Sequence, residues 1–141
     1  MIYVVGFLFS NDYRWVTLIR KNRPDWQAGK YNGVGGKVER GEAVQDAMVR
    51  EFFEETGVKT KWDDWDEFAL LQGSKGDTIY VFSAVSTPYL SAVKTKTDEE
   101  VMNILVKHVL DADEPYPVVP NLPVLIRLAL MDNVKYATLE Y

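Results

Sequence analysis

The 141-residue chain contains no cysteine and only one histidine, His108. The absence of cysteine excludes a disulfide framework, a thiol nucleophile, a cysteine-based zinc site and an iron–sulfur cluster. A lone histidine also excludes every metal site that needs two or more histidine ligands. Any chemistry that the chain performs must therefore use carboxylates, lysine or arginine, and hydroxyl groups.

Long apolar runs and an excess of positive charge are also missing. No stretch reaches the roughly 18–20 apolar residues of a membrane helix, and the N-terminal MIYVVGFLF lacks the charged start and the cleavage site of a signal peptide. Sixteen Lys and Arg against 21 Asp and Glu give a net charge of −5, whereas generic nucleic-acid binding needs a basic surface. We expect a cytoplasmic protein with no membrane partner and no DNA or RNA duplex partner.

The length and the pattern of apolar residues predict one domain over residues 1–141, and they leave monomer and homodimer open. Runs of β-branched and aromatic residues predict strands at 2–9, 15–20, 68–71, 78–85 and 101–110. Helices are predicted over 43–56, closed by Gly57, and over 122–131, with Asn121 as N-cap. Residues 21–33 are predicted to form a loop. Strands mixed with two helices indicate an α/β or α+β sandwich.

The first predicted helix carries three glutamates on one face. Glu51, Glu54 and Glu55 stand at i, i+3 and i+4, where they repel one another unless a cation lies among them. Carboxylate oxygens are hard ligands that suit Mg²⁺ or Mn²⁺. The alternative is a solvated acidic face, which is common on surface helices.

A longer pattern surrounds these glutamates. Arg50 lies about 100° around the helix from Glu51 and is expected to orient an acid of a neighbouring segment, Glu42 or Glu39. Residues 36–58 fit G-x5-E-x7-R-E-U-x-E-E-x-G-U, where U is a bulky apolar residue, without a departure. The fixed positions are Gly36, Glu42, Arg50, Glu51, Glu54, Glu55 and Gly57. The probability that all seven fixed positions match by chance is on the order of 10⁻⁸ per start position. On this pattern the chain resembles the Nudix hydrolase family.

The resemblance implies an α/β/α sandwich with a mixed β-sheet, which hydrolyses a nucleoside diphosphate linked to another group X with Mg²⁺ or Mn²⁺. It implies that Glu51, Glu54 and Glu55 are metal ligands, together with the carbonyl of Gly35 or Gly36. Glu42 and Arg50 would support the loop and helix of the motif, and Gly57 would close that helix.

The general base differs among family members, and some use a glutamate outside the motif. Residues 98–100 form the acidic cluster of the later part of the chain, and we choose Glu100 as the ligand or base there. The alternative for Glu100 is a solvated turn before a strand.

Four basic residues are candidate phosphate contacts. Lys37 follows the motif glycine, and Arg20, Lys21 and Arg23 follow the second predicted strand. Each of them has the alternative of a solvated surface charge, because most Lys and Arg are exposed.

Two asparagines are candidates for reading a nucleotide base. The segment from Tyr31 to Lys37 is similar to the one that precedes the motif in MutT-like oxidised-purine nucleoside triphosphatases, and there Asn32 would bond the base through its donor and acceptor. Asn121 begins a segment similar to the last helix of these enzymes. The alternatives are a turn residue with positive φ for Asn32 and a plain N-cap for Asn121.

We therefore expect hydrolysis of a (deoxy)nucleoside triphosphate, such as an oxidised purine like 8-oxo-dGTP, to the monophosphate and pyrophosphate. Two alternatives remain open: a pyrophosphatase of ADP-ribose or nucleotide sugars on the same metal site, and a Nudix sensor that binds a nucleotide without cleaving it.

Overall fold

Strand β1 (Ile2–Phe9) lies inside the sheet and pairs along both of its edges. One edge pairs in parallel with β6 (Thr78–Val85) along its whole length. The other edge is divided, because residues 8–9 pair with β2 (Trp15–Arg20) and residues 3–6 pair with β4 (Val34–Lys37), both antiparallel. The computed structural model describes residues 1–111, 113–114 and 116–141.

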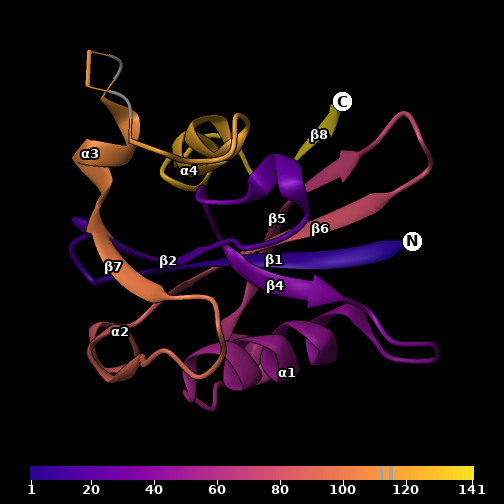
Figure 1. Ribbon diagram of the computed structural model, residues 1–141, viewed down its shortest axis with the longest axis horizontal. Helices are drawn as coiled ribbons and strands as arrows, with labels where there is room; N and C mark the ends of the chain where they lie inside the picture. The colour runs from indigo at the N-terminus through magenta and orange to yellow at the C-terminus, as the bar shows by residue number, and fades with distance from the viewer. Residues whose placement is uncertain (112, 115) are drawn as a thin grey trace.

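Within these ranges, eight strands form one mixed sheet in the order β3-β2-β1-β6-β5-β8, with β4 paired to β1 and β7 paired to β2 (Figure 1). The strands not yet given are β3 (Tyr31–Asn32), β5 (Asp66–Gln72), β7 (Val101–Leu105) and β8 (Ala137–Glu140).

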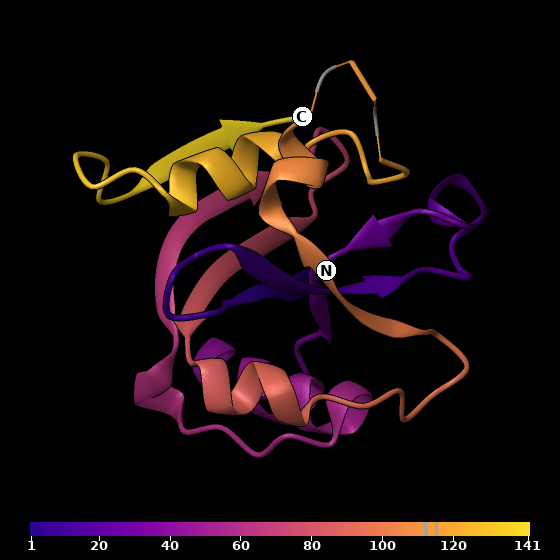
Figure 2. The same cartoon turned by 90° about the vertical axis from the view of Figure 1, so that its left-hand side faces the viewer.

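Helices cover both faces of this sheet. On one face lie α1 (Val44–Thr56) and α2 (Thr87–Ala92), and on the other lie α3 (Val106–Leu110) and α4 (Leu122–Ala129) (Figures 1 and 2). Two single 3₁₀ turns, η1 (Asp25–Gln27) and η2 (Trp62–Asp64), lie in connections. The predicted α/β/α sandwich with a mixed sheet is confirmed. No helix of the described ranges is long and apolar enough to cross a membrane.

The apolar run of β1 is explained by burial on both faces. Val4 and Leu8 pack in the core on the α1 side, whereas Val5, Phe7 and Phe9 pack in the core on the α4 side. Side chains alternate along a strand, so a strand covered on both faces is apolar at every position.

One strand prediction was too long. The structure ends β7 at Leu105, which pairs with Trp15, the first residue of β2, so the partner strand runs out at this point. The Val106 N–H then donates to the Arg14 carbonyl at 2.8 Å, and α3 begins. Val106 and Val109 are both buried, which is the spacing of one helix face rather than of a strand.

The remaining predictions of secondary structure differ in smaller ways. Strands β1, β2 and β6 have the predicted bounds, and α1 ends before Gly57, whose φ of 75° is left-handed. The predicted loop 21–33 contains η1 and β3, while β4, η2, α2 and β8 were not predicted. Asn121 precedes α4 as expected, but its side chain makes no capping hydrogen bond.

Phe52 and Phe53 provide a matched test of the packing of α1. Phe52 is fully buried with its ring centroid 5.1 Å from that of Trp65, whereas Phe53 is 50% exposed. We expect Phe52→Ala to lower the free energy of unfolding by about 3–5 kcal/mol, because a large cavity opens in the core, and Phe53→Ala to lower it by about 1 kcal/mol or less. Urea unfolding of the two variants measures this, and equal losses would contradict the assigned faces of the helix.

Candidate active site

Arg50 and Glu42 form a bidentate ion pair beneath the loop that leads into α1. Arg50 Nε and Nη2 donate to the two Glu42 carboxylate oxygens at 2.8 and 2.9 Å. These hydrogen bonds hold the pKa of Glu42 below its ordinary value and raise the pKa of Arg50. Glu42 also accepts the Glu39 N–H at 3.0 Å, which closes the loop on itself. The structure thus brings together Arg50 and Glu42, as the sequence predicts.

Arg50 also contacts the acidic face of its own helix. Its Nη1 lies 2.9 Å from Glu51 Oε1 and 3.4 Å from Glu54 Oε2, and its Nη2 donates to the Lys37 carbonyl at 3.1 Å. The sequence requires a cation among these acids, and Arg50 supplies part of that charge. One guanidinium therefore connects the loop, the end of β4 and the carboxylate face of α1.

The Glu51 carboxylate lies directly against the Gly36 backbone. A Cβ atom at position 36 would stand 2.5 Å from Glu51 Oε2, closer than Cβ atoms come to other heavy atoms in real structures. Burial raises the pKa of Glu51 above its ordinary value, against the hydrogen bond from Arg50 that lowers it. Glycine at this position is therefore what lets a carboxylate of α1 approach the β4 backbone.

Glu55 is the most buried carboxylate of the helix, with 8% of its surface exposed. Burial raises its pKa to about 8, and Lys21 opposes this shift while the charges of Glu51 and Glu99 add to it. The Gly35 backbone amide also lowers the pKa of Glu55. The ionised form of Glu55 is thus disfavoured first by burial and then by the charges of Glu51 and Glu99.

The residues present fit a divalent cation. Glu51, Glu54 and Glu55 offer hard carboxylate oxygens, and the Gly36 cradle would be filled by any Cβ atom. In the part of the chain that the structure describes, no group of three acidic or histidine side chains is already arranged to hold a metal ion. Arg50 lies against Glu51 and Glu54 instead.

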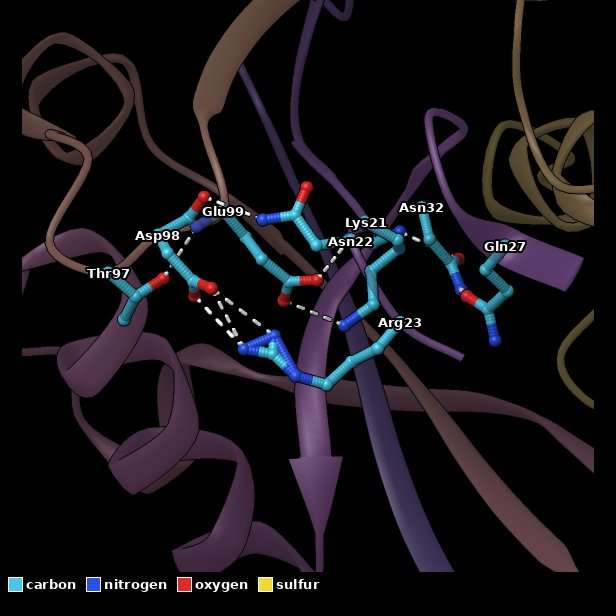
Figure 3. Close-up of polar contacts among 9 residues, drawn as sticks. Lys21, Asn22, Arg23, Gln27, Asn32, Thr97, Asp98 and Glu99 are labelled. Atoms are coloured by element: carbon cyan, nitrogen blue, oxygen red, sulfur yellow. Dashed lines mark hydrogen bonds and ion pairs between the residues drawn. The ribbon is translucent and has the colours of Figure 1, made fainter. Parts of the chain in front are cut away.

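The structure places Glu99, not Glu100, toward the helix acids. Glu99 is buried, accepts from Lys21 Nζ at 3.0 Å and from the Asn22 N–H at 2.6 Å, and raises the pKa of Glu55 (Figure 3). Glu100 is exposed, and its charge acts on Tyr31. The choice of Glu100 overlooked the alternation of β7.

The register of β7 in the sheet separates the two glutamates. Val101 packs on the α1 side of the sheet, and Ile104 packs on the α4 side. Extending the period of two backward from β7 places Glu99 on the side of Val101 and Glu100 on the opposite side.

A cavity of about 310 Å³ lies beside Gly35 and Gly36, and Glu51 lies against the Gly36 backbone, although the carboxylates of α1 do not line the cavity itself. Its lining includes three of the predicted substrate contacts, Lys21, Arg23 and Asn32, together with Gly35 and Gly36. Its remaining lining residues are Tyr3, Val4, Val5, Pro24, Trp26, Gln27, Gly33, Asp77, Ile79 and Tyr141. A volume of this size is at the lower end of the range for small-molecule sites.

Asn32 is positioned by local hydrogen bonds at the wall of the cavity. It belongs to β3 and pairs with Ile19, so the alternative of a turn residue is wrong. Its Oδ1 accepts the Gly33 N–H at 2.8 Å, and its Nδ2 donates to Gln27 Oε1 at 3.3 Å (Figure 3).

Trp26 is a cavity residue that the sequence reasoning missed. It is 60% exposed and lies in η1, within the polar segment 21–33. An aromatic residue isolated in a polar loop was the available signal, since such a residue has no core position to explain it.

The other candidates do not line this cavity. Arg20 is exposed, on the opposite side of β2 from Lys21, and its charge acts on Tyr31. Lys37 lines a separate shallow groove beside Glu51 and Glu54. Asn121 is half-buried at the start of α4.

The comparison with family models covers most of the chain, including α1. A model described as NUDIX domain matches residues 1–122 of the chain. The chain belongs to the Nudix hydrolase family. Nudix hydrolases act on nucleotide pyrophosphate bonds and generally use divalent metal ions.

Individual relatives of this Nudix chain are more distant. It is 42% identical over 41 residues to the oxidized purine nucleoside triphosphate hydrolase of Mus musculus. This match covers 29% of this chain and only 26% of the length of that relative. The mutator MutT protein of Bacillus halodurans superposes with a TM-score of 0.69 at 18% identity, over 99% of this chain and 89% of that one. The NUDIX domain of Shewanella oneidensis NrtR, complexed with ADP ribose, gives 0.69 at 18% identity, over 92% and 86%.

The raised pKa of Glu55 predicts how stability depends on pH in the metal-free protein. Between about 4.5, the ordinary value, and about 8, the folded chain keeps a proton that the unfolded chain has lost. The free energy of unfolding should therefore fall as pH rises through this window, by up to about 1.4 kcal/mol per pH unit. Urea unfolding in EDTA measures this slope, which Glu55→Gln should reduce, and the part that remains is expected from Glu51, whose pKa is also raised. A slope as steep as that of the wild-type chain would refute the assignment to Glu55.

Proposed function

We propose that the chain is a nucleoside triphosphate pyrophosphohydrolase that uses Mg²⁺ or Mn²⁺ and yields a monophosphate and pyrophosphate, with an oxidised purine such as 8-oxo-dGTP as the preferred substrate. The observation that carries this proposal is the cavity, which joins Asn32 to the Gly35–Gly36 backbone on which Glu51 lies. Asn32, which suits a base, and the Gly35–Gly36 backbone, beside which phosphate would bind, thus line the same cavity.

The base end of the cavity is formed by Asn32 and Trp26. The Asn32 amide offers a donor and an acceptor to a purine edge, at the cost of its weak bond to Gln27 at 3.3 Å. The exposed Trp26 ring offers a flat apolar surface on which a base stacks.

The phosphate end is formed by cationic side chains, and Glu51 and Glu54 lie in the neighbouring groove. Lys21 and Arg23 line the cavity as its cationic groups, and each forms an ion pair with an acid of residues 98–99. A divalent ion held by Glu51, Glu54, Glu55 and the carbonyl of Gly35 or Gly36 would offset charge on the phosphates and lower the pKa of the attacking water.

The side chains of α1 have separate roles in this proposal. Arg50 orients Glu51 and Glu54 through its Nη1. Glu54, whose side chain is 53% exposed, is the helix acid that water reaches most readily. We assign to the Glu54 carboxylate the role of general base, which accepts a proton from the attacking water. It replaces Glu100, which the sequence suggested for this role.

One relative supports the proposed substrate class, and another is consistent with the alternative of ADP-ribose. The 41-residue match is to an oxidized purine nucleoside triphosphate hydrolase, whereas one solved relative is complexed with ADP ribose. ADP-ribose or nucleotide-sugar hydrolysis, and binding without cleavage, are the alternatives. We propose removal of damaged nucleotides in the cytoplasm by a one-domain monomer or homodimer, with no duplex nucleic acid or membrane partner.

A substrate panel tests this function. The purified chain with Mg²⁺ or Mn²⁺ is given canonical and oxidised nucleoside triphosphates, dinucleotides, ADP-ribose and nucleotide sugars, and the products are identified by chromatography. Pyrophosphate released with a monophosphate supports the proposal, with the highest kcat/KM expected on an oxidised purine. Absence of hydrolysis on the whole panel would leave only the binding alternative.

Glu54→Gln tests the carboxylate face. The variant keeps the size of the side chain and removes its charge, so we expect kcat to fall at least about a hundredfold, because electrostatic stabilisation by a bound divalent ion amounts to several kcal/mol. The melting temperature should be unchanged, since Glu54 is exposed. Glu140→Gln, at an exposed position of β8, is the matched control and should retain full activity.

Asn32→Ala tests base recognition. We expect the ratio of kcat/KM between an oxidised and a canonical purine nucleotide to change about 5- to 30-fold, the effect of one hydrogen bond of 1–2 kcal/mol. Asn133→Ala, at an exposed position, is the control. An unchanged ratio in Asn32→Ala would show that Asn32 does not read the base.

A further inference from the structure

Arg23, at the edge of the cavity, is already engaged by an acid of this chain. Its Nη2 lies 3.0 and 3.2 Å from the two carboxylate oxygens of Asp98, and its Nη1 lies 3.4 Å from one of them (Figure 3). Asp98 belongs to residues 93–100, here named the strap, which connect α2 to β7. Arg23 also lines the cavity, so the same guanidinium faces both the strap and the space proposed for the phosphates.

The strap is held in place without Arg23. Glu99 binds Lys21 Nζ and the Asn22 N–H, the Asp98 carbonyl accepts from Asn22 Nδ2 at 2.8 Å, and the Glu100 carbonyl accepts the Arg20 N–H at 2.8 Å. Asp98 therefore stays beside Arg23 when the guanidinium moves, and removal of its charge leaves the strap tethered.

A carboxylate and a phosphate compete for the same groups of an arginine. The planar guanidinium binds either anion through two parallel N–H groups, and the Nη groups of Arg23 are directed at Asp98. We propose that Asp98 occupies the Arg23 guanidinium as an internal competitor of the substrate phosphates, and that it thereby sets the affinity for the phosphate chain. This inference rests on the proposed function and adds a residue that determines affinity outside the Nudix motif.

The exposure of the pair determines the size of the effect. The side chains of Arg23 and Asp98 are 63% and 65% exposed, and such pairs are weak and readily exchanged. The expected gain in affinity on removing the Asp98 charge is therefore about two- to fivefold. If Asp98 instead held Arg23 ready for substrate, the same change would weaken binding, so the sign of the effect decides between the two roles.

The test compares Asp98→Asn with the wild-type chain. Isothermal titration calorimetry with inorganic pyrophosphate and Mg²⁺ should give a dissociation constant about two- to fivefold lower for Asp98→Asn. On the best nucleotide of the panel, KM should fall by the same factor while kcat is unchanged. Circular dichroism and the melting temperature confirm that the variant is folded.

Two further variants separate competition from a general change of charge. Asp25→Asn removes one charge from an exposed residue of the same loop, two positions from Arg23, and should leave the dissociation constant unchanged. In an Arg23→Ala background, adding Asp98→Asn should have no further effect, because the group being competed for is gone.

Each result of these measurements supports or overturns the proposal. An unchanged or raised dissociation constant in Asp98→Asn, an equal gain in Asp25→Asn, a gain that persists without Arg23, or no detectable pyrophosphate binding in any variant overturns it. If no nucleotide is hydrolysed and pyrophosphate still binds Asp98→Asn more tightly, the proposed function fails and this inference stands.

Discussion

The guanidinium of Arg50 is the interaction on which the arrangement of the site depends. It is bidentate to Glu42, contacts Glu51 and Glu54, and donates to the Lys37 carbonyl. The loop that leads into α1, the last residue of β4 and the helix itself are therefore fixed to one rigid group. Lysine could not replace it, because a single ammonium lacks the planar, divergent donors that these positions require.

The cavity lies where the sheet divides. The edge of β1 is shared between β2 and β4, so the chain must cross from β3, which follows β2, to β4 within one residue. That residue is Gly33, where a Cβ atom would stand 2.7 Å from Val5 and 2.8 Å from Phe7. The separation of β3 from β4 leaves the space between Asn32 and Gly36. The same geometry explains why glycines are concentrated in residues 33–36.

Local patterns predicted much of this site, and tertiary pairing decided the rest. The i, i+3, i+4 spacing is enough to place Glu51, Glu54 and Glu55 on one face, and the prediction of their common orientation needs no knowledge of other segments. The distinction between Glu99 and Glu100 required the register of β7. The end of β7 at Leu105 depended on where β2 begins, 90 residues earlier. Strand β8 escaped prediction because an edge strand is defined by its distant partner β5 rather than by its own sequence. Trp26 was missed although its place in a polar loop was a signal.

The central position of β1 also affects how the chain is made. Ile2 pairs with Thr78, so one whole edge of the first strand finds its partner 76 positions later. During synthesis this apolar segment leaves the ribosome long before β6 exists, with unpaired backbone groups along that edge. Pairing over such a separation is slow, and an exposed apolar edge is prone to aggregate. The strand that lines the cavity with Tyr3, Val4 and Val5 thus also needs protection in the nascent chain before the sheet closes.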